Sequence, residues 1–132
     1  GRTMNSPKPY ETIPVLLETY FEGLHKADSA MLSGVFHPHA QYVSATPEDY
    51  RVLSFDEYRK ALDQRVPPAS NGETRNERII SIETGGPTLA FARVEMTMMG
   101  RDYTDFLTLI YDQGRWAIMA KIFHYEITSQ GD

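Results

Sequence analysis

Asp105 is the side chain of this sequence that is best placed for chemistry. Tight hairpins are expected at Gly100–Arg101 and Gln113–Gly114, and their geometry fixes which residues of the last strands share a face. In this register the Asp105 carboxylate lies on the apolar face, between Met96 and Ile122. A charge is costly there unless it is compensated, and burial raises the pKa of a carboxyl group. The pattern therefore predicts a pocket acid or base, or else a carboxylate that either lies where the sheet opens to solvent or is a buried structural acceptor.

The polar residues nearest to Asp105 in this register are Tyr103 and His124, one pair further along the strands. A pocket bounded by these side chains and by the methionines of the preceding strand follows from the register. We expect its ligand-binding wall to include these residues of the last strands: Tyr103, Met96, Met98, Trp116 and Leu107. If Met96, Met98 and Trp116 instead plug the interior, the chain is a structural subunit with a filled core.

Two side chains of the expected first helix point toward the same pocket. Tyr20 lies on the apolar stripe of residues 13–24, where its hydroxyl is available to a ligand oxygen. His25 lies one turn beyond Phe21, at the border of this stripe. Plain packing is the alternative for both, with Tyr20 as a core residue and His25 as a boundary histidine.

The pair of His37 and His39 does not predict a metal site. The two residues flank Pro38, and no further ligands at a suitable spacing accompany them. The sequence has no cysteine, so thiol nucleophiles and thiolate metal sites are excluded. It also lacks a glycine-rich phosphate loop and the strand-elbow serine motif. We therefore expect neither a metal nor a cofactor.

Three helices and a sheet must position these residues. The helices are expected at residues 13–24, 28–36 and 54–66, and the strands at residues 41–45 and 50–53 and in four segments after residue 73. Ser54 and Glu57 form the expected capping box of the third helix. An apolar sheet face must be covered, and the helices are the available cover. The sequence thus predicts an α+β fold in which three N-terminal helices pack on a strongly curved antiparallel sheet that encloses a pocket.

The composition is that of an ordinary globular domain. The chain has 132 residues, of which 41% are hydrophobic and 23% charged, which excludes a disordered or fibrous protein. The formal net charge of −5 argues against a nucleic acid partner. No apolar run approaches the roughly 20 residues of a membrane span, so we expect no membrane contact and a cytoplasmic location. We expect residues 1–9 to be a flexible leader with a tag remnant at Gly1, and residues 10–132 to form a single domain.

Five segments carry a recognisable pattern: residues 20–28, 35–38, 103–109, 114–118 and 121–124. In these strings and in the order of its elements, the chain resembles the nuclear transport factor 2-like superfamily, and more narrowly its putative lumazine-binding branch. The resemblance covers nearly the whole chain. It implies the cone-shaped fold of ketosteroid isomerases, scytalone dehydratase and SnoaL-like polyketide cyclases, a fold that carries both enzymes and non-catalytic modules.

The resemblance also implies roles for two residues. Asp105 falls near the pocket carboxylic acid that, in ketosteroid isomerases, helps a tyrosine of the first helix to stabilise an enolate oxygen. Tyr20 is the candidate for that tyrosine. Those enzymes carry a carboxylate base on the first strand, but residues 41–45 contain none, so His25 or His124 would have to supply it.

Two functions and the structural alternative remain open. The leading hypothesis is a binding protein for a small, largely apolar molecule, aromatic or cyclic, held between helices and sheet. It forms a homodimer through the mixed outer sheet face that carries Arg93, Glu95 and Phe106. The alternative is a cofactor-independent isomerase, dehydratase or cyclase that uses Asp105 as acid or base. Its candidate catalytic residues are Asp105, Tyr20, His25 and His124.

Overall fold

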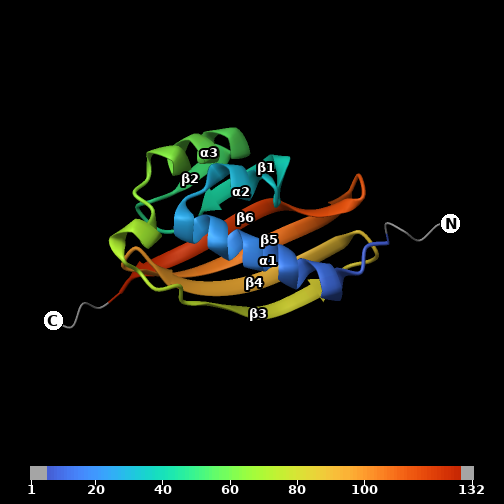
Figure 1. Cartoon of the computed structure of the whole chain (residues 1–132). Helices are drawn as coiled ribbons and strands as arrows, with labels where there is room; N and C mark the ends of the chain where they lie inside the picture. The colour runs from blue at the N-terminus through green and yellow to red at the C-terminus, as the bar shows by residue number, and fades with distance from the viewer. Residues whose placement is uncertain (1–5, 129–132) are drawn as a thin grey trace.

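Within the described residues 6–128, six strands form one curved sheet in the order β2-β1-β6-β5-β4-β3. The computed structural model places the helices on one side of this sheet, with α1 lying across the strands (Figure 1). The part of the expected leader at residues 1–5 lies outside the described residues. The elements are α1 (Pro9–Lys26), α2 (Ser29–Ser33), β1 (Phe36–Ser44), β2 (Arg51–Ser54), α3 (Phe55–Gln64), the 3-10 turn η1 (Pro68–Asn71), β3 (Glu77–Thr84), β4 (Leu89–Met98), β5 (Arg101–Asp112) and β6 (Arg115–Ile127).

The first helix, α1, forms where apolar residues recur every three to four positions, as the sequence predicts. Its buried residues are Ile13, Leu17, Tyr20, Phe21, Gly23 and Leu24. The helix ends at Ala27, whose left-handed conformation lets its N–H donate to the carbonyl of Leu24 at 3.2 Å. Within residues 6–128, no helix is both long and apolar enough to cross a membrane.

The second helix is shorter than the sequence pattern predicts. The Asp28 side chain caps α2 at its start, but the helix has only five residues. Phe36 already belongs to β1, because the N–H of Ile118 in β6 donates to the carbonyl of Val35 at 2.8 Å and draws the chain into the sheet. The three predicted helices are therefore present, but only α1 and α3 are long. Only α1 and the short α2 precede the sheet, and α3 follows β1 and β2, where its predicted bounds place it.

The capping box predicted for α3 is present. The N–H of Glu57 donates to the Ser54 hydroxyl at 3.1 Å, and the N–H of Ser54 donates to the Glu57 carboxylate at 2.9 Å. The cap fixes the rotation of the helix, which buries Phe55, Tyr58 and Leu62. The ring of Tyr58 thereby reaches the interior of the cone.

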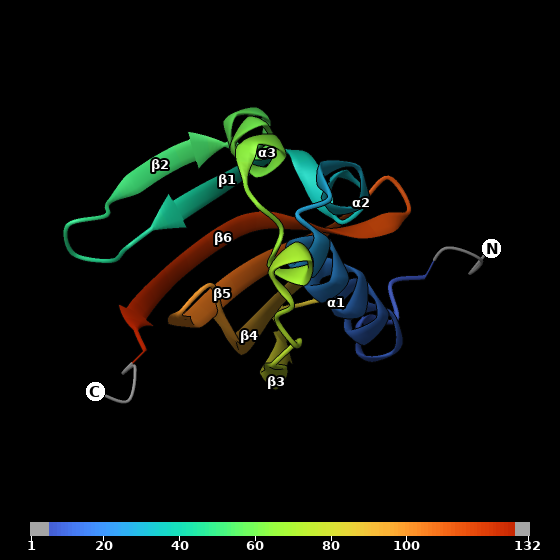
Figure 2. The ribbon, with the colours of Figure 1, turned by 60° about the vertical axis from the view of Figure 1, so that its left-hand side comes forward.

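The sheet is mixed rather than wholly antiparallel. β1 runs parallel to β6, whereas the other neighbouring strands are antiparallel. The predicted antiparallel sheet is therefore wrong for this pair, since strands so far apart in the chain are joined by no hairpin turn that the sequence could reveal. Figure 2 shows the consequence: β1 and β2 lie on one side of β6, β5, β4 and β3 on the other, and the sheet curls around α1.

The turn between β4 and β5 lies at Met99–Gly100, one residue earlier than expected. Both residues have positive φ angles, of 56° and 73°, as tight hairpin turns require. The ladder therefore pairs Asp105 with Val94 rather than with Met96. Asp105 nevertheless stays on the predicted face, because a shift of two positions preserves the alternation.

A bulge in β6 changes which of its side chains face the core. The ladder with β5 follows the predicted register as far as Leu109 and then skips Met119. Every later residue of β6 is displaced by one position. Lys121 therefore points inward and is 5% exposed, whereas Ile122 points outward and is 45% exposed.

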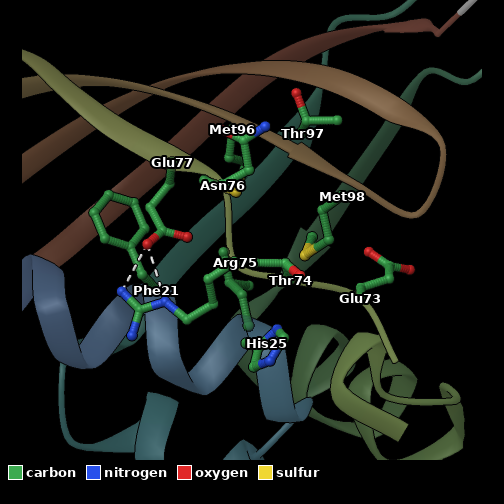
Figure 3. Close-up of a pocket in the computed structure, with 11 residues that line it drawn as sticks. Phe21, His25, Glu73, Thr74, Arg75, Asn76, Glu77, Met96, Thr97 and Met98 are labelled. Atoms are coloured by element: carbon green, nitrogen blue, oxygen red, sulfur yellow. Dashed lines mark hydrogen bonds and ion pairs between the residues drawn. The ribbon is translucent and has the colours of Figure 1, made fainter. Parts of the chain in front are cut away.

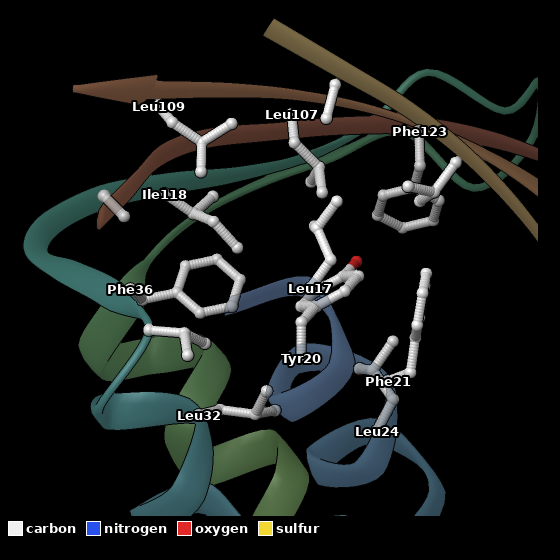
Figure 4. Close-up of a cluster of buried hydrophobic side chains, with 14 of the residues drawn as sticks. Leu17, Tyr20, Phe21, Leu24, Leu32, Phe36, Leu107, Leu109, Ile118 and Phe123 are labelled. Atoms are coloured by element: carbon white, nitrogen blue, oxygen red, sulfur yellow. The ribbon is translucent and has the colours of Figure 1, made fainter. Parts of the chain in front are cut away.

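The core lies between the helices and the concave face of the sheet. Figure 4 shows side chains of α1 and α2 facing those of β5 and β6. Its fully buried side chains include Tyr20, Tyr58, Phe36, Leu17, Leu107, Leu109 and Ile118. Few polar side chains enter this region, so those that do are candidates for a functional site.

Candidate functional site

Tyr20 and Asp105 meet in the interior of the cone. The hydroxyl of Tyr20 donates a hydrogen bond to Oδ2 of Asp105 at 2.5 Å, and both side chains are buried. α1 supplies the tyrosine on its buried stripe, and β5 supplies the carboxyl group on its inner face. Figure 4 shows the Tyr20 hydroxyl pointing from α1 toward the strands. The structure thus brings together the two residues that the sequence suggests as a pair.

Burial changes the proton affinity of both groups. Desolvation raises the pKa of Asp105 above its ordinary value, although Lys121 and the Tyr20 hydrogen bond act in the opposite direction. Desolvation also raises the pKa of Tyr20 well above its ordinary value, and the charge of Asp105 adds to the effect. Tyr20 is therefore a hydroxyl donor, and Asp105 holds its proton at a higher pH than an exposed carboxyl group does.

Lys121 is the third polar group in this region. Its Nζ lies 3.9 Å from Oδ2 of Asp105 and 3.5 Å from the Tyr58 hydroxyl. Only 7% of the surface of its side chain is exposed to solvent. We call Tyr20, Tyr58, Asp105 and Lys121 the interior cluster.

Aromatic rings enclose the Lys121 amine. Its Nζ lies 5.2 to 5.5 Å from the ring centroids of Tyr20, Tyr42, Tyr58 and Phe123. These distances are typical of cation–π contacts. Leu107, one of the predicted wall residues, lies opposite Lys121 in the ladder. The surroundings of the amine are therefore flat and apolar, which suits an aromatic or cyclic ligand better than a strongly hydrated one.

Two polar atoms of the interior cluster lack good partners. Oδ1 of Asp105 is buried and accepts no hydrogen bond from the residues that the structure describes. The amine of Lys121 offers up to three N–H donors, yet within residues 6–128 it makes one long hydrogen bond, to Tyr58. Buried polar groups are nearly always paired in proteins. These two atoms therefore mark a position that suits the polar group of a ligand.

A narrow pocket lies at the C-terminal end of α1 (Figure 3). His25 of α1 and the predicted residues Met96 and Met98 of β4 line it, together with residues 73–77. Arg75 closes one side by ion pairs to Glu18, Glu22 and Glu77 at 2.7 to 2.9 Å. The cavity has a volume of about 10 Å³, roughly the space that one water molecule needs.

Two side chains stand between this pocket and the interior cluster. Phe21 lines the pocket, and its ring lies 5.7 Å from the ring of Tyr20. Met96 also lines the pocket and is two residues from Val94, the ladder partner of Asp105. His25 and Met98 line this pocket, and within residues 6–128 no hydrogen bond or ion pair joins them to the polar atoms of the cluster.

Tyr103 belongs to the same aromatic layer as the interior cluster. Its ring lies 5.8 Å from that of Phe123 and 5.3 Å from that of Tyr125. Arg101 donates to its hydroxyl at 3.1 Å. This residue is where the sequence places it, on the inner face beside Asp105.

Trp116 lies at the far end of the sheet. It pairs with Tyr111, six positions from Asp105 along β5, which corresponds to about 20 Å. Its indole N–H donates to the carbonyl of Pro7 at 2.6 Å. Trp116 therefore anchors the segment before α1, and the prediction that it lines the same pocket as Asp105 is wrong.

His124 lies on the outer face, so its predicted place beside Asp105 is also wrong. The β6 bulge turns this side chain outward, where it lines a groove with two other predicted residues, Met96 and Tyr103, and with Glu126 and Asp102. Because of the same bulge, strand alternation alone predicts the wrong face of the sheet for Lys121. A usable signal is the spacing of Lys121, Phe123 and Tyr125, because two large aromatic residues at alternate positions indicate the buried side of a strand.

The remaining histidines form a separate contact. Nε2 of His37 lies 3.1 Å from Oδ2 of Asp112, and the N–H of His39 donates to Nδ1 of His37 at 3.1 Å. Among residues 6–128, no group of three or more potential metal-binding side chains gathers at one place. The contact therefore links β1 to the end of β5.

The model of the family described as "Putative lumazine-binding" matches residues 8–124. The chain belongs to this family. The match includes all four residues of the interior cluster, and the fold is that of the nuclear transport factor 2-like superfamily.

Known proteins similar to this chain include an enzyme and proteins of the same fold. Aldolase FrzH from Cladobotryum sp. is 28% identical over 117 residues, which cover 87% of this chain and 90% of that protein. An NTF2-like protein from Shewanella baltica OS155 superposes with a TM-score of 0.79 at 26% identity, covering 90% of this chain and 94% of the other. A ketosteroid isomerase-like protein from Erwinia carotovora atroseptica has a TM-score of 0.71 at 12% identity, over 89% and 96% of the chains. This last likeness shows the fold alone.

Proposed function

We propose that this member of the lumazine-binding family binds a small carbonyl compound inside the cone and activates it by proton transfer without a cofactor. The observation that carries the proposal is the buried hydrogen bond from Tyr20 to Asp105, next to a carboxyl oxygen without a protein partner. Acid groups held in a dry interior are suited to stabilising charge that develops on a substrate oxygen.

The two residues have complementary roles in this proposal. Tyr20 remains protonated, because its pKa is raised well above the ordinary value, and it stays available as a hydrogen-bond donor. Asp105 is a carboxyl group whose raised pKa brings its proton exchange closer to neutral pH. Together they support removal of a hydrogen next to a carbonyl group, the step that isomerisation and aldol reactions share.

The similarity to an aldolase supports this reaction class. FrzH matches 87% of this chain and 90% of its own length, so the resemblance extends over most of the fold rather than over one element. An aldol reaction needs an enolate or its equivalent, and an interior acid pair is suited to forming one. We therefore propose an aldol reaction as a further candidate, in addition to the isomerase, dehydratase and cyclase reactions that the sequence suggests.

A non-catalytic structural role is the second candidate, and the closed interior favours it. The pocket beside the cluster has a volume of only about 10 Å³, and Phe21 and Met96 separate it from the polar atoms. Ligand access in our proposal requires these side chains to move. Met96 and Met98 have flexible side chains, which makes this end of the cone the proposed route.

Hydrogen exchange of simple ketones tests the catalytic proposal. The protein should accelerate the loss of α-hydrogens from acetone, cyclohexanone or acetophenone in D₂O, followed by proton NMR. Asp105→Asn and Tyr20→Phe should each reduce the acceleration by about 100-fold, the usual worth of a positioned acid or base. Asp102→Asn and Tyr10→Phe, at exposed positions of the same strand and helix, are matched controls. Binding of a ketone without exchange would indicate a binding protein, and neither binding nor exchange would indicate a structural one.

The outer sheet face is the proposed homodimer surface. Phe106 and Ile122, ladder partners on β5 and β6, are each 45% exposed. Phe91 packs against Phe106 at 5.3 Å between ring centroids, and the Arg93 guanidinium lies 5.8 Å from the Phe106 ring. Apolar groups surrounded by charged ones are typical of protein interfaces.

A further inference from the structure

We propose that Lys121 is the amine that condenses with the carbonyl group of the substrate, so that aldehydes or ketones are held as an imine on this residue. The inference deepens the proposed function and rests on it. It also needs no histidine base, which agrees with the outward position of His124 and with the place of His25 in the narrow pocket.

The position of Lys121 is unusual for a lysine. Lys26 and Lys60 are 53% and 73% exposed in their side chains, whereas Lys121 is 7% exposed. The backbone holds it in the sheet interior, beside Tyr42 of β1 and Leu107 of β5. A primary amine fixed in an apolar interior is the arrangement that imine-forming enzymes use.

A purely structural ion pair does not account for the geometry. Charged hydrogen bonds between nitrogen and oxygen measure about 2.7 to 2.9 Å. The Lys121 Nζ lies 3.9 Å from Asp105 Oδ2, so the two groups face each other without direct contact. Because Oδ1 of Asp105 also lacks a partner among the described residues, the pair is suited to flanking a third polar group.

The reaction needs Lys121 as a neutral amine, and Asp105 is placed to take its proton. An ammonium with a carboxylate, and an amine with a carboxylic acid, contain the same number of protons. Burial raises the pKa of Asp105 above its ordinary value, so this carboxyl group accepts a proton more readily than an exposed one. Tyr20 holds the carboxyl group in place through its hydrogen bond.

Condensation then proceeds with a closed proton balance. The nitrogen lone pair of Lys121 forms a bond to the carbonyl carbon, and the carbon–oxygen π bond breaks as the oxygen takes the proton of Asp105. The hydroxyl group leaves as water with one hydrogen from the nitrogen, and an iminium remains. Of the three hydrogens that the amine and the acid bring, two end in water and one stays on nitrogen.

The carboxylate of Asp105 next removes the hydrogen from the carbon beside the iminium, which gives an enamine and restores the carboxylic acid. The enamine carbon either regains the proton from Asp105 or attacks a second carbonyl group. In the second case a carbon–carbon bond forms, the π bond of that carbonyl breaks, and its oxygen takes the proton of Asp105 to give the aldol hydroxyl group. One water molecule hydrolyses the product imine and releases Lys121. No external oxidant or reductant is consumed.

Reductive trapping with benzaldehyde and sodium cyanoborohydride tests the inference. The hydride reduces an imine to a stable benzyl amine, and peptide mass mapping shows which lysine carries it. Unassisted labelling follows exposure, so Lys26 and Lys60 should react first and Lys121 last. We expect the reverse, with Lys121 labelled about tenfold faster than Lys60 in the folded protein. The preference should disappear in urea.

Variants separate this inference from the proposed function. Lys60→Met should leave the labelling of Lys121 unchanged, and Lys121→Arg, which keeps the positive charge, should remove the fast label and slow ketone exchange. If the lysines of the wild-type protein are labelled in the order of their exposure, the proposed imine on Lys121 is wrong. This result does not depend on whether Lys121→Arg folds. If exchange still depends on Asp105 and Tyr20 in that case, the proposed function stands without the imine. If Lys121 is labelled fast but Asp105→Asn does not slow ketone exchange, the proposed role of the acid pair is wrong and the imine stands.

Discussion

The Tyr20 hydroxyl on α1 and the Asp105 carboxyl on β5, 85 positions apart in the chain, share a buried hydrogen bond of 2.5 Å. The bond joins the helical layer to the sheet through polar atoms in an otherwise apolar core. Removing one partner leaves the other buried with a polar group unsatisfied, which is costlier than the bond itself is worth.

Tyr20→Phe should lower the free energy of unfolding by about 1–3 kcal/mol, because Asp105 loses its donor while remaining buried. Denaturant unfolding measures the change, and Tyr10→Phe, at a 61% exposed position of the same helix, is the control. In a double-mutant cycle with Asp105→Asn, the two effects should be non-additive by about 0.5–3 kcal/mol. Additive effects would show that the hydrogen bond contributes nothing to folding.

The stability that depends on Asp105 should fall as pH rises. Burial raises its pKa in the folded protein above the ordinary value of an aspartate, so the folded state holds the proton more tightly than the unfolded state. The contribution is complete below the unfolded pKa and is lost as pH rises through the folded one. The unfolding free energy of the wild type relative to Asp105→Asn should therefore decrease as pH rises from below the ordinary carboxyl pKa through the raised pKa of the folded protein.

Chemical denaturation at several pH values measures this difference. Subtracting the Asp105→Asn curve removes the contributions of carboxyl groups that both proteins share, such as Asp49 and Glu18, whose pKa values are lowered. Asp102→Asn, on the same strand but exposed, should not reproduce the trend. A relative stability that stays constant or increases with pH contradicts the raised pKa.

The parts of the site that follow local periodicity could be predicted from the sequence. Apolar spacing places Tyr20 on the buried stripe of α1, and the alternation of β5 places Asp105 on the inner face. The predicted face of Asp105 is correct although the turn lies one residue earlier than predicted, because a displacement of two residues in the ladder leaves the face unchanged. Capping chemistry likewise located the start of α3 at Ser54.

The parts that depend on interruptions or distant pairing could not be predicted. The extra residue Met119 in β6 moves Lys121 into the core and His124 out of it, and alternation alone does not reveal a bulge. The parallel pairing of β1 with β6 competes with the second helix and ends it early at Ser33. Such effects belong to tertiary structure, which overrides local preference.

Arg75→Gln should destabilise the protein by loosening the segment before β3 from α1. The Arg75 guanidinium donates to Glu18, Glu22 and Glu77, and this contact also closes the narrow pocket. A network of several charges around one arginine contributes more than an isolated surface pair. We expect a few-fold change in the unfolding equilibrium constant at neutral pH.

The effect of Arg75→Gln should diminish in acid. The hydrogen bond from Arg75 holds the pKa of Glu18 below its ordinary value, so its stabilising contribution is present above that value and is lost as pH falls. Arg78→Gln, which removes a more exposed pair with Glu95, is the control and should change stability less. Equal losses in the two variants would show that the network adds nothing beyond single pairs.

Phe106→Glu should separate the proposed homodimer. The substitution replaces an exposed ring on the outer face by a carboxylate, and Glu95 already stands on the neighbouring strand of that face. In a two-fold interface the change occurs in both copies, so two carboxylates replace two rings at the contact and must lose their hydration when the dimer forms. Within each chain the new carboxylate faces Arg93, its ladder partner. Size-exclusion chromatography with light scattering should show a dimer for the wild type and a monomer for the variant.

Tyr50→Glu, at a 74% exposed position outside this face, should remain dimeric. A monomeric wild type removes the dimer but leaves the interior site untouched, since the cluster lies on the opposite side of the sheet from Phe106 and within a single chain.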